Sequence, residues 1–216
     1  MRQRPPLAER LTIPGPCGAL EALIETPQPG PHAPARAFGV VCHPHPLHGG
    51  TMHSKVVWTV ARAFEQFGAP AIRFNFRGAG ASEGGYADGV GETADALAVI
   101  AFARQRFPGA VLWLGGFSFG AAVAVRAASE AHPERLVLVA PGITRVGVQG
   151  TAPPGCPWLI VQGDADDVVP AQAVLDWART LSPAPTMRLL PAAGHFFHGR
   201  INELRDVVVD FLAAAP

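Results

Sequence analysis

Short apolar runs alternate with longer amphipathic segments along most of the chain, and this alternation predicts the order of strands and helices. Only the N-terminal part is less regular, because its two strand candidates are weak and a proline-rich stretch at 26–35 predicts a loop after them. The predicted strands are residues 11–13, 19–25, 37–42, 70–76, 111–115, 135–140, 158–162 and 187–190, and the predicted helices are residues 53–67, 90–107, 119–132, 171–181 and 200–214.

The later strands are apolar at nearly every position rather than at every second one. Strands of this kind, separated by helices, are typical of a parallel sheet that helices cover on both faces. The sequence therefore predicts an α/β fold in a single domain spanning residues 1–216, with an N-terminal tail and the first strand in residues 1–18. In such folds the functional residues gather in the loops that leave the carboxyl ends of the strands.

Composition narrows the choice of function. The 216 residues are 49% hydrophobic and 16% charged with a net charge of +0, which indicates a globular protein with no electrostatic attraction for nucleic acid or an anionic membrane surface. The N-terminus has no apolar run of a secretory signal, and no segment is long and apolar enough to span a membrane. The three cysteines form no C-x-x-C pair. We therefore expect a cytoplasmic protein with buried thiols, and the sequence leaves a homodimer open.

A candidate nucleophile lies in the segment VLWLGGFSFG at 111–120, which contains the pattern G-x-S-x-G around Ser118. The pattern stands between an apolar strand and an alanine-rich helix, as a nucleophile elbow requires. Gly116 and Gly120 remove side chains that would collide in such a sharp turn. The start of the helix also favours negative charge near Ser118. A helix-capping serine in a glycine-rich turn is the alternative interpretation, but the strand–turn–helix setting favours a nucleophile.

A serine hydroxyl becomes a good nucleophile only when a base removes its proton, and an acid orients that base. With a nucleophile elbow the acid follows the serine along the chain, after a later strand. Three aspartates follow the strand at 158–162. Asp164 is nearest to the strand, and Asp167 is a candidate cap for the next helix. We predict that the acid is Asp166, which lies between them.

The base is expected after the last strand, since the histidine comes third in this order. Gly194 allows a sharp turn that brings the next residue, His195, back over the sheet, and we predict that His195 is the base. His198 follows one helical turn later. We interpret it as a surface or capping histidine.

Two further segments make the chain similar to the α/β-hydrolase-fold serine hydrolases, and specifically to compact bacterial members without a lid. They are H-P-H-P-x-x-G-G-T-M at 43–52 and R-x-N-x-R-G-x-G-x-S-x-G at 73–84. The resemblance runs from about Leu20 to the last helix, and it implies the α/β-hydrolase fold, a mostly parallel sheet with helices on both faces and no lid domain. The family pattern G-x-x-D-x-V-V-P falls on Asp166, and the H-F-F end of the family pattern G-x-x-H-F-F falls on His195–Phe197. Ser54 is a departure, because Asn is expected before Lys55.

The resemblance also assigns an oxyanion hole made of two backbone N–H groups. One belongs to Phe119, the residue after the nucleophile. The other comes from the loop after the third strand, where prolines 44 and 46 have no N–H. His45, Leu47 and the residues just after them therefore remain, and analogy with related enzymes favours His45.

The histidines at 43, 45 and 48 also have a spacing that resembles a metal site. However, Leu47 stands where a zinc-hydrolase motif has aspartate, and no later cluster supplies convincing further ligands. We therefore predict no metal and no organic cofactor. The side chains of His43 and His48 are expected to shape the loop by hydrogen bonding or to line the pocket.

These assignments together predict a serine hydrolase that cleaves small acyl esters through an acyl-enzyme intermediate. Residues 141–157 are too short for a helical lid, so an open site is expected, with carboxylesterase activity favoured over lipase activity. The predicted substrate-binding side chains are His43, Leu47, Phe117 and Phe196; Phe119 and Phe197 are further candidates for an acyl wall, with core packing as the alternative. A peptidase, a thioesterase or an acyltransferase with the same triad also remains open, and so does a non-catalytic binding module.

Overall fold

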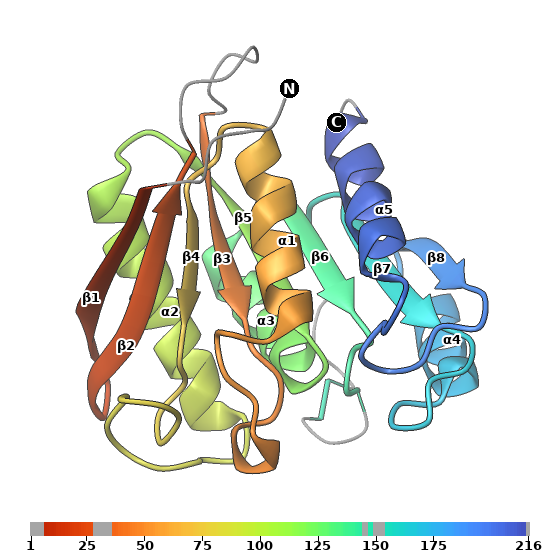
Figure 1. Ribbon diagram of the computed structural model, residues 1–216, viewed down its shortest axis with the longest axis horizontal. Helices are drawn as coiled ribbons and strands as arrows, with labels where there is room; N and C mark the ends of the chain where they lie inside the picture. The colour runs from red at the N-terminus through yellow and green to blue at the C-terminus, as the bar shows by residue number, and fades with distance from the viewer. Residues whose placement is uncertain (1–6, 28–35, 144–146, 149–153, 215–216) are drawn as a thin grey trace.

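A computed structural model describes residues 7–27, 36–143, 147–148 and 154–214 of the chain. Its centre is a sheet of eight strands in the order β1-β2-β4-β3-β5-β6-β7-β8 (Figure 1). The strands are β1 (Leu7–Gly15), β2 (Gly18–Thr26), β3 (Ala37–Cys42), β4 (Ala71–Phe74), β5 (Val111–Phe117), β6 (Arg135–Val139), β7 (Trp158–Gly163) and β8 (Thr186–Leu190).

The sheet is parallel from β4 to β8, as the apolar strands predict. The two weak N-terminal strands form a separate pattern, since β1 pairs antiparallel with β2 and β2 pairs antiparallel with β4. A tight turn between Gly15 and Gly18 connects them, and a connection this short allows only an antiparallel pair. β1 is largely exposed at the sheet edge, which explains why its apolar pattern is weak.

Helices cover both faces of the sheet (Figure 1). On one face α1 (Lys55–Gln66) packs against α5 (Ile201–Ala213), and on the other α2 (Val90–Arg106) packs against α3 (Phe119–Ala131). The fourth helix, α4 (Ala171–Arg179), follows β7. Two buried apolar clusters fill the space between the sheet and its helices, one on each side. The predicted α/β-hydrolase arrangement of a mostly parallel sheet between helical layers is therefore confirmed.

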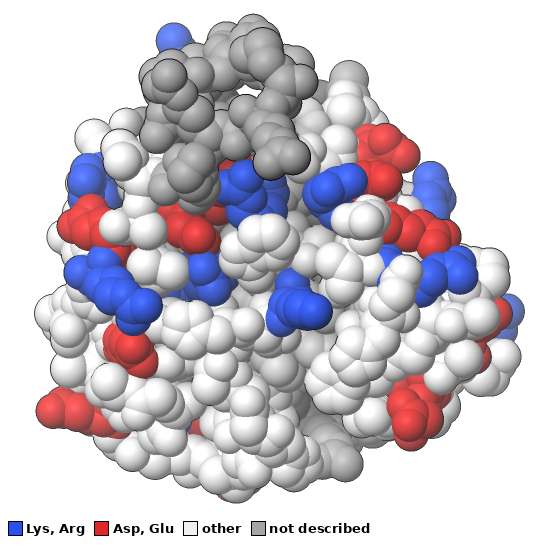
Figure 2. Space-filling view, viewed as in Figure 1, with Lys and Arg blue, Asp and Glu red and all other residues white. Residues whose placement is uncertain are grey.

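The loops at the carboxyl ends of the parallel strands form one edge of the molecule, the lower edge in Figure 1. Charged residues of both signs are mixed over the middle of the face in Figure 2, while the part along that lower edge is mostly uncharged. Between Val139 and Trp158 the described residues contain no helix or strand, and no described helix is long and apolar enough to cross a membrane.

Candidate active site

Ser118 occupies a strained turn between β5 and α3. Its backbone has φ 54° and ψ −116°, a left-handed conformation that side-chain-bearing residues rarely adopt. Backbone hydrogen bonds to the neighbouring loop after β6 help to hold it there: the Ser118 N–H donates to the Val139 carbonyl at 2.9 Å, and the Ser118 carbonyl accepts from the Gly142 N–H at 3.0 Å. The turn places the hydroxyl above the carboxyl edge of the sheet, as a nucleophile elbow does.

The two glycines of the pattern are required by close contacts. A Cβ atom on Gly116 would lie 2.3 Å from the Gly120 carbonyl oxygen, and one on Gly120 would lie 2.4 Å from the carbonyl oxygens of Cys42 and His43. In both cases the obstacle is backbone, which cannot rotate away as a side chain can. The elbow therefore depends on the absence of both side chains.

We expect Gly120→Ala to destabilise the protein by about 3 kcal/mol or more, because either α3 or the end of β3 must move to admit the methyl group. Urea denaturation measures this change in the free energy of unfolding. Gly155→Ala is the matched control, since a Cβ there meets nothing within 4 Å. A Gly120→Ala protein as stable as this control would contradict the close approach of α3 to β3.

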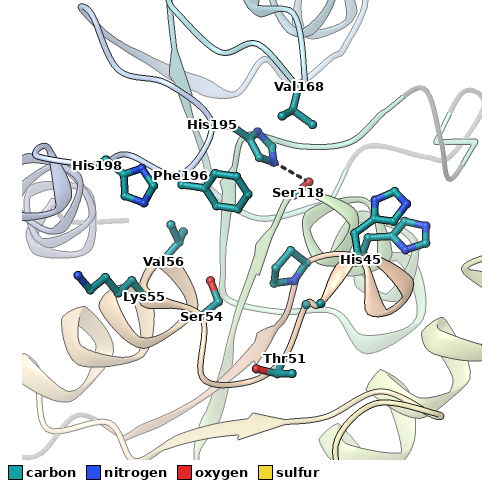
Figure 3. A pocket seen from close by; sticks show the side chains of 14 residues that line it. His45, Thr51, Ser54, Lys55, Val56, Ser118, Val168, His195, Phe196 and His198 are labelled. Atoms are coloured by element: carbon teal, nitrogen blue, oxygen red, sulfur yellow. Dashed lines mark hydrogen bonds between the residues drawn. The ribbon is translucent and has the colours of Figure 1, made fainter.

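The side chains of Ser118, His195 and Asp166 form one continuous hydrogen-bonded chain. His195 Nε2 lies 3.0 Å from Ser118 Oγ (Figure 3). On the other side of the ring, His195 Nδ1 lies 2.8 Å from Asp166 Oδ2. His195 is only 4% exposed. The three residues come from the loops after β5, β8 and β7, so the structure brings together the three side chains that the sequence predicts. This geometry allows a proton to pass from the hydroxyl to the imidazole.

Asp166 is held as a carboxylate by four donors. Its Oδ1 accepts from the N–H groups of Val168 (2.9 Å) and Val169 (2.7 Å), while its Oδ2 accepts from Gln162 Nε2 (3.0 Å) as well as from His195. Burial alone would raise the pKa of Asp166, but the hydrogen bonds from His195, Val169 and Val168 outweigh burial and lower it. Asp166 therefore stays ionised at neutral pH and orients the ring of His195.

The two neighbouring aspartates have other positions. Asp164 Oδ1 accepts a hydrogen bond from the Ala192 N–H at 2.6 Å, which ties the loop after β7 to the loop after β8. Asp167 is exposed, and α4 begins after Pro170 without a side-chain cap, so the candidate role of Asp167 as a helix cap is wrong. Among the three, only Asp166 reaches His195.

Phe119 is the first residue of α3, so its backbone N–H has no partner within the helix. It follows Ser118 directly and lies at the positive end of the helix. This position is the one expected for the second donor of an oxyanion hole.

The other expected donor lies in the turn around the short 3₁₀ helix η1 (Pro46–His48). Leu47 N–H donates to His45 Nδ1 at 3.3 Å, and the N–H groups of His48 and Gly50 both donate to the His45 carbonyl at 3.0 Å. These three N–H groups cannot also bind an oxyanion without opening the turn. Of the two donors named from the sequence, this favours His45 over Leu47.

His43 has a structural role rather than a place in the pocket. It is fully buried, its Nε2 accepts from the Phe76 N–H at 2.9 Å, and its Nδ1 lies 2.6 Å from the Pro44 carbonyl oxygen. Both ring nitrogens are therefore used within the protein, in the neutral Nδ1–H tautomer. The prediction that His43 contacts substrate is wrong, while the alternative that it shapes the loop agrees with the structure.

Burial lowers the pKa of His43 to about 4, and the hydrogen bond to Pro44 offsets only part of this shift. We expect ¹⁵N NMR to show a neutral Nδ1–H ring for His43 throughout pH 5–8. Because the pKa in the unfolded chain is about 6.5, this ring stabilises the fold fully above about pH 6.5, and the contribution is lost as the pH falls towards 4.

The ring must be observed directly, because burial raises the pKa of Glu65 to about 7 and changes stability in the opposite sense over part of the same range. A His43 resonance that titrates with a midpoint above pH 6 would contradict a buried ring that is hydrogen-bonded at both nitrogens.

The loop at residues 43–52, which contains His43, His45 and His48, is held by hydrogen bonds to the end of β4. Arg73 Nη1 donates to the Met52 carbonyl at 2.6 Å, and Asn75 Oδ1 accepts from the Met52 N–H at 2.8 Å. Both side chains continue to β2: Arg73 binds the Glu25 carboxylate with two nitrogens at 2.8 and 2.9 Å, and Asn75 Nδ2 donates to Glu21 at 2.7 Å. Both Arg73 and Asn75 belong to the family segment at 73–84. Only the structure shows that this segment holds the other family segment, at 43–52, in place.

A cavity of about 460 Å³ opens beside Ser118 (Figure 3). The described residues that line it share a position in the loops at the carboxyl edge of the sheet or at the start of α1. They are Pro44, His45, His48, Gly49, Gly50, Thr51, Ser54, Lys55, Val56, Ser118, Val168, His195, Phe196 and His198. None of them is an aspartate or a glutamate.

Of the predicted substrate-binding side chains, only Phe196 lines this cavity, where it is 50% exposed. Phe117 is fully buried under the His195 ring, so its predicted contact with substrate is wrong. Leu47 is exposed and lies outside the lining of this cavity, and its role in substrate binding stays a prediction. Phe119 and Phe197 are core residues too. His198, interpreted as a surface or capping residue, stacks on Phe196 and lines the pocket.

No group of three or more histidine, cysteine, aspartate or glutamate side chains in the described part of the chain is arranged to hold a metal ion. The H-x-H-x-x-H spacing does not bring its rings to one point, because His43 is turned inward against Phe76, whereas the rings of His45 and His48 stack on each other.

Comparison with known proteins gives concordant results. Residues 45–156 match the family model described as serine aminopeptidase, S33. An uncharacterised protein of Rickettsia prowazekii is 34% identical over 193 residues, which cover 84% of this chain and 79% of that protein. A serine α/β hydrolase without a lid from Xanthomonas campestris is 40% identical, with a TM-score of 0.92 and full coverage of both chains. An α/β serine hydrolase homologue from Coxiella burnetii is 42% identical, with a TM-score of 0.90 over 95% of this chain and 97% of that one.

Proposed function

The chain belongs to the α/β-hydrolase family described as serine aminopeptidase S33, and on this premise we propose that it is a lidless serine hydrolase that cleaves small carboxylic esters. The observation that carries the proposal is the hydrogen-bonded chain from Ser118 through His195 to Asp166 beside an open cavity. We further propose that it acts as one domain in the cytoplasm, without a cofactor or a nucleic-acid or membrane partner.

In the proposed reaction His195 Nε2 takes the proton of Ser118 as the Oγ attacks the ester carbonyl carbon. The carbonyl oxygen becomes an oxyanion, which the N–H groups of Phe119 and His45 stabilise; each such donor contributes about 10²–10³ in rate. His195 then gives its proton to the leaving alcohol. Water attacks the acyl-enzyme with His195 as base, and this step releases the acid and regenerates Ser118.

The lining of the cavity supports an ester rather than a peptide with a free amino terminus. An aminopeptidase has to bind a substrate ammonium group, and a carboxylate is the side chain that pairs with it. The described residues around the cavity include no carboxylate, and Lys55 is the only lysine or arginine among them. A substrate ammonium group would therefore meet repulsion here instead of a partner.

The extent of the cavity supports a small acyl group. A volume of about 460 Å³ lies in the lower part of the range for small-molecule sites. The apolar side chains of the lining are those of Pro44, Val56, Val168 and Phe196, which are too few to bury a long lipid chain.

The chain-length preference tests this proposal. With 4-nitrophenyl esters from acetate to palmitate, we expect kcat/KM to be highest for acyl chains of two to six carbons and to fall for longer ones, because the surplus chain stays in water. An alanine 4-nitroanilide, tested in parallel, should not be cleaved measurably. Highest activity on long chains would contradict the open-site interpretation, and efficient anilide cleavage would favour the aminopeptidase alternative.

A further inference from the structure

Lys55 is the only lysine of the chain, and it lines the cavity beside Ser118. It is the first residue of α1, and its side chain extends away from Ser118 on the side of the cavity where His198 lies, with the nitrogen at the outer end (Figure 3). Phe196 stands between this end and the triad, while His45 lies on the other side of Ser118. The cavity therefore has one positively charged end, separated from the reacting atoms.

The charge of Lys55 is not used for folding. The seven ion pairs between arginines and carboxylates in the described residues do not include Lys55, and neither does the contact between His195 and Asp166. No hydrogen bond within the described part of the chain involves its ammonium group either. An ammonium group on a cavity wall that contains no carboxylate is left to pair with a ligand.

The groups around Lys55 also favour a negatively charged ligand. Ser54 precedes it as the N-cap of α1, but its hydroxyl makes no capping hydrogen bond, and it lines the cavity. The first turn of α1 contains no acidic residue that would neutralise the positive end of the helix. His198 adds a ring nitrogen that can donate a hydrogen bond. Each of these groups favours an anion, and a planar carboxylate can accept from more than one of them.

We infer that the ester cleaved by this protein carries a carboxylate at the end far from the scissile bond, and that Lys55, with Ser54 beside it, binds this carboxylate. The inference rests on the proposed esterase function and specifies its substrate class as monoesters of dicarboxylic acids, or hydroxy or phenolic acids that are acylated on their hydroxyl group and keep a free carboxylate. Because the ammonium group points away from Ser118, several atoms must separate the carboxylate from the ester carbonyl.

The test compares anionic esters with their neutral counterparts. For the acyl side, the 4-nitrophenyl monoesters of hexanedioic and octanedioic acids are compared with the same compounds capped as methyl esters. For the alcohol side, 4-acetoxyphenylacetate is compared with its methyl ester. The measured quantity is the ratio of kcat/KM for the anionic ester to kcat/KM for the capped one, in the native protein and in Lys55→Met, Lys55→Arg and Lys55→Glu.

In at least one of the two series, we expect Lys55→Met to lower this ratio about tenfold and Lys55→Glu to lower it further, because a neutral or negative end no longer attracts the carboxylate. Lys55→Arg should keep the ratio within about threefold, since it retains the charge. Arg188→Met, which removes an exposed positive charge on β8, is the matched control and should leave the ratio as in the native protein.

An unchanged ratio in all Lys55 variants, while the capped esters are still cleaved, would overturn the inference and leave the proposed function intact. Failure of the native protein to cleave any ester of the set would overturn the proposed function, and this inference with it.

Discussion

Replacing Ser118 by alanine is expected to lower kcat for ester hydrolysis by about 10⁵–10⁶-fold, because the substitution removes the only atom that can form the acyl-enzyme. The remaining activity would come from the oxyanion donors and from substrate binding, which act without the nucleophile. The same substitution should abolish covalent labelling by a fluorophosphonate, since this reagent forms its bond with the activated serine oxygen.

The free energy of unfolding of the Ser118→Ala protein shows whether a loss of activity is due to misfolding. Alanine keeps the left-handed backbone at position 118, and the only side-chain bond lost is the one to His195 Nε2, so the free energy of unfolding should change by about 1 kcal/mol or less. Undiminished labelling of a folded Ser118→Ala protein would show that the nucleophile lies elsewhere. No labelling of the native protein would favour a non-catalytic binding module.

The second large effect is expected for Asp166→Asn, which should lower kcat about 10⁴-fold. The Asp166 Oδ1 position can still accept from the two backbone N–H groups, but the other position would become an NH₂ group facing two donors, Gln162 Nε2 and His195 Nδ1. The ring of His195 must then change its tautomer or turn, and in either case Nε2 can no longer take the proton of Ser118.

Asp167→Asn is the matched control, because it makes the same chemical change one residue away on an exposed side chain. It should alter kcat less than about twofold. Activity is measured with the preferred 4-nitrophenyl ester, and the pH profile is recorded for each protein. Equal losses in the two variants would mean that the loop as a whole, rather than the Asp166–His195 hydrogen bond, supports the reaction.

The fold could be predicted from the sequence where burial dictates the pattern. β3 begins and ends at the predicted residues because all six of its residues are buried, so apolar residues end where the strand ends. β1 is nine residues long, whereas only three were predicted, because it is exposed at the edge and its length is set by pairing with β2. β5 continues two residues beyond its prediction, to Phe117, since Gly116 and Phe117 pair with β6.

The triad could be predicted because each member follows a strand whose end is clear in the sequence. The residues that line the pocket could not be predicted, because the direction of a loop side chain depends on contacts with residues that are distant along the chain. Phe117 and Phe196 have the same chemistry in sequence, but Phe117 is the last residue of β5 and points under the His195 ring, while Phe196 lies in the loop after β8 and faces the cavity.

The anchoring of the loop at residues 43–52 could not be predicted from the sequence for a similar reason. Arg73 and Asn75 alternate with phenylalanines, which predicts only that their side chains leave the sheet on the same side. Their partners are a backbone peptide at Met52 and two glutamates on β2, about fifty residues away along the chain. A polar network that crosses such a distance gives no local signal in the sequence.

Through this network the antiparallel hairpin of β1 and β2, at the edge of the sheet, helps to position the loop at residues 43–52. No described residue of the hairpin lines the cavity. However, its two glutamates accept hydrogen bonds from Arg73 and Asn75, the two side chains that bind the peptide at Met52. A shortened protein that starts after residue 26 would retain every atom of the triad. It would nevertheless lose Glu25, the carboxylate that pairs with Arg73, and Glu21, the acceptor for Asn75. We therefore expect the peptide at Met52 to lose its fixed position in such a shortened protein.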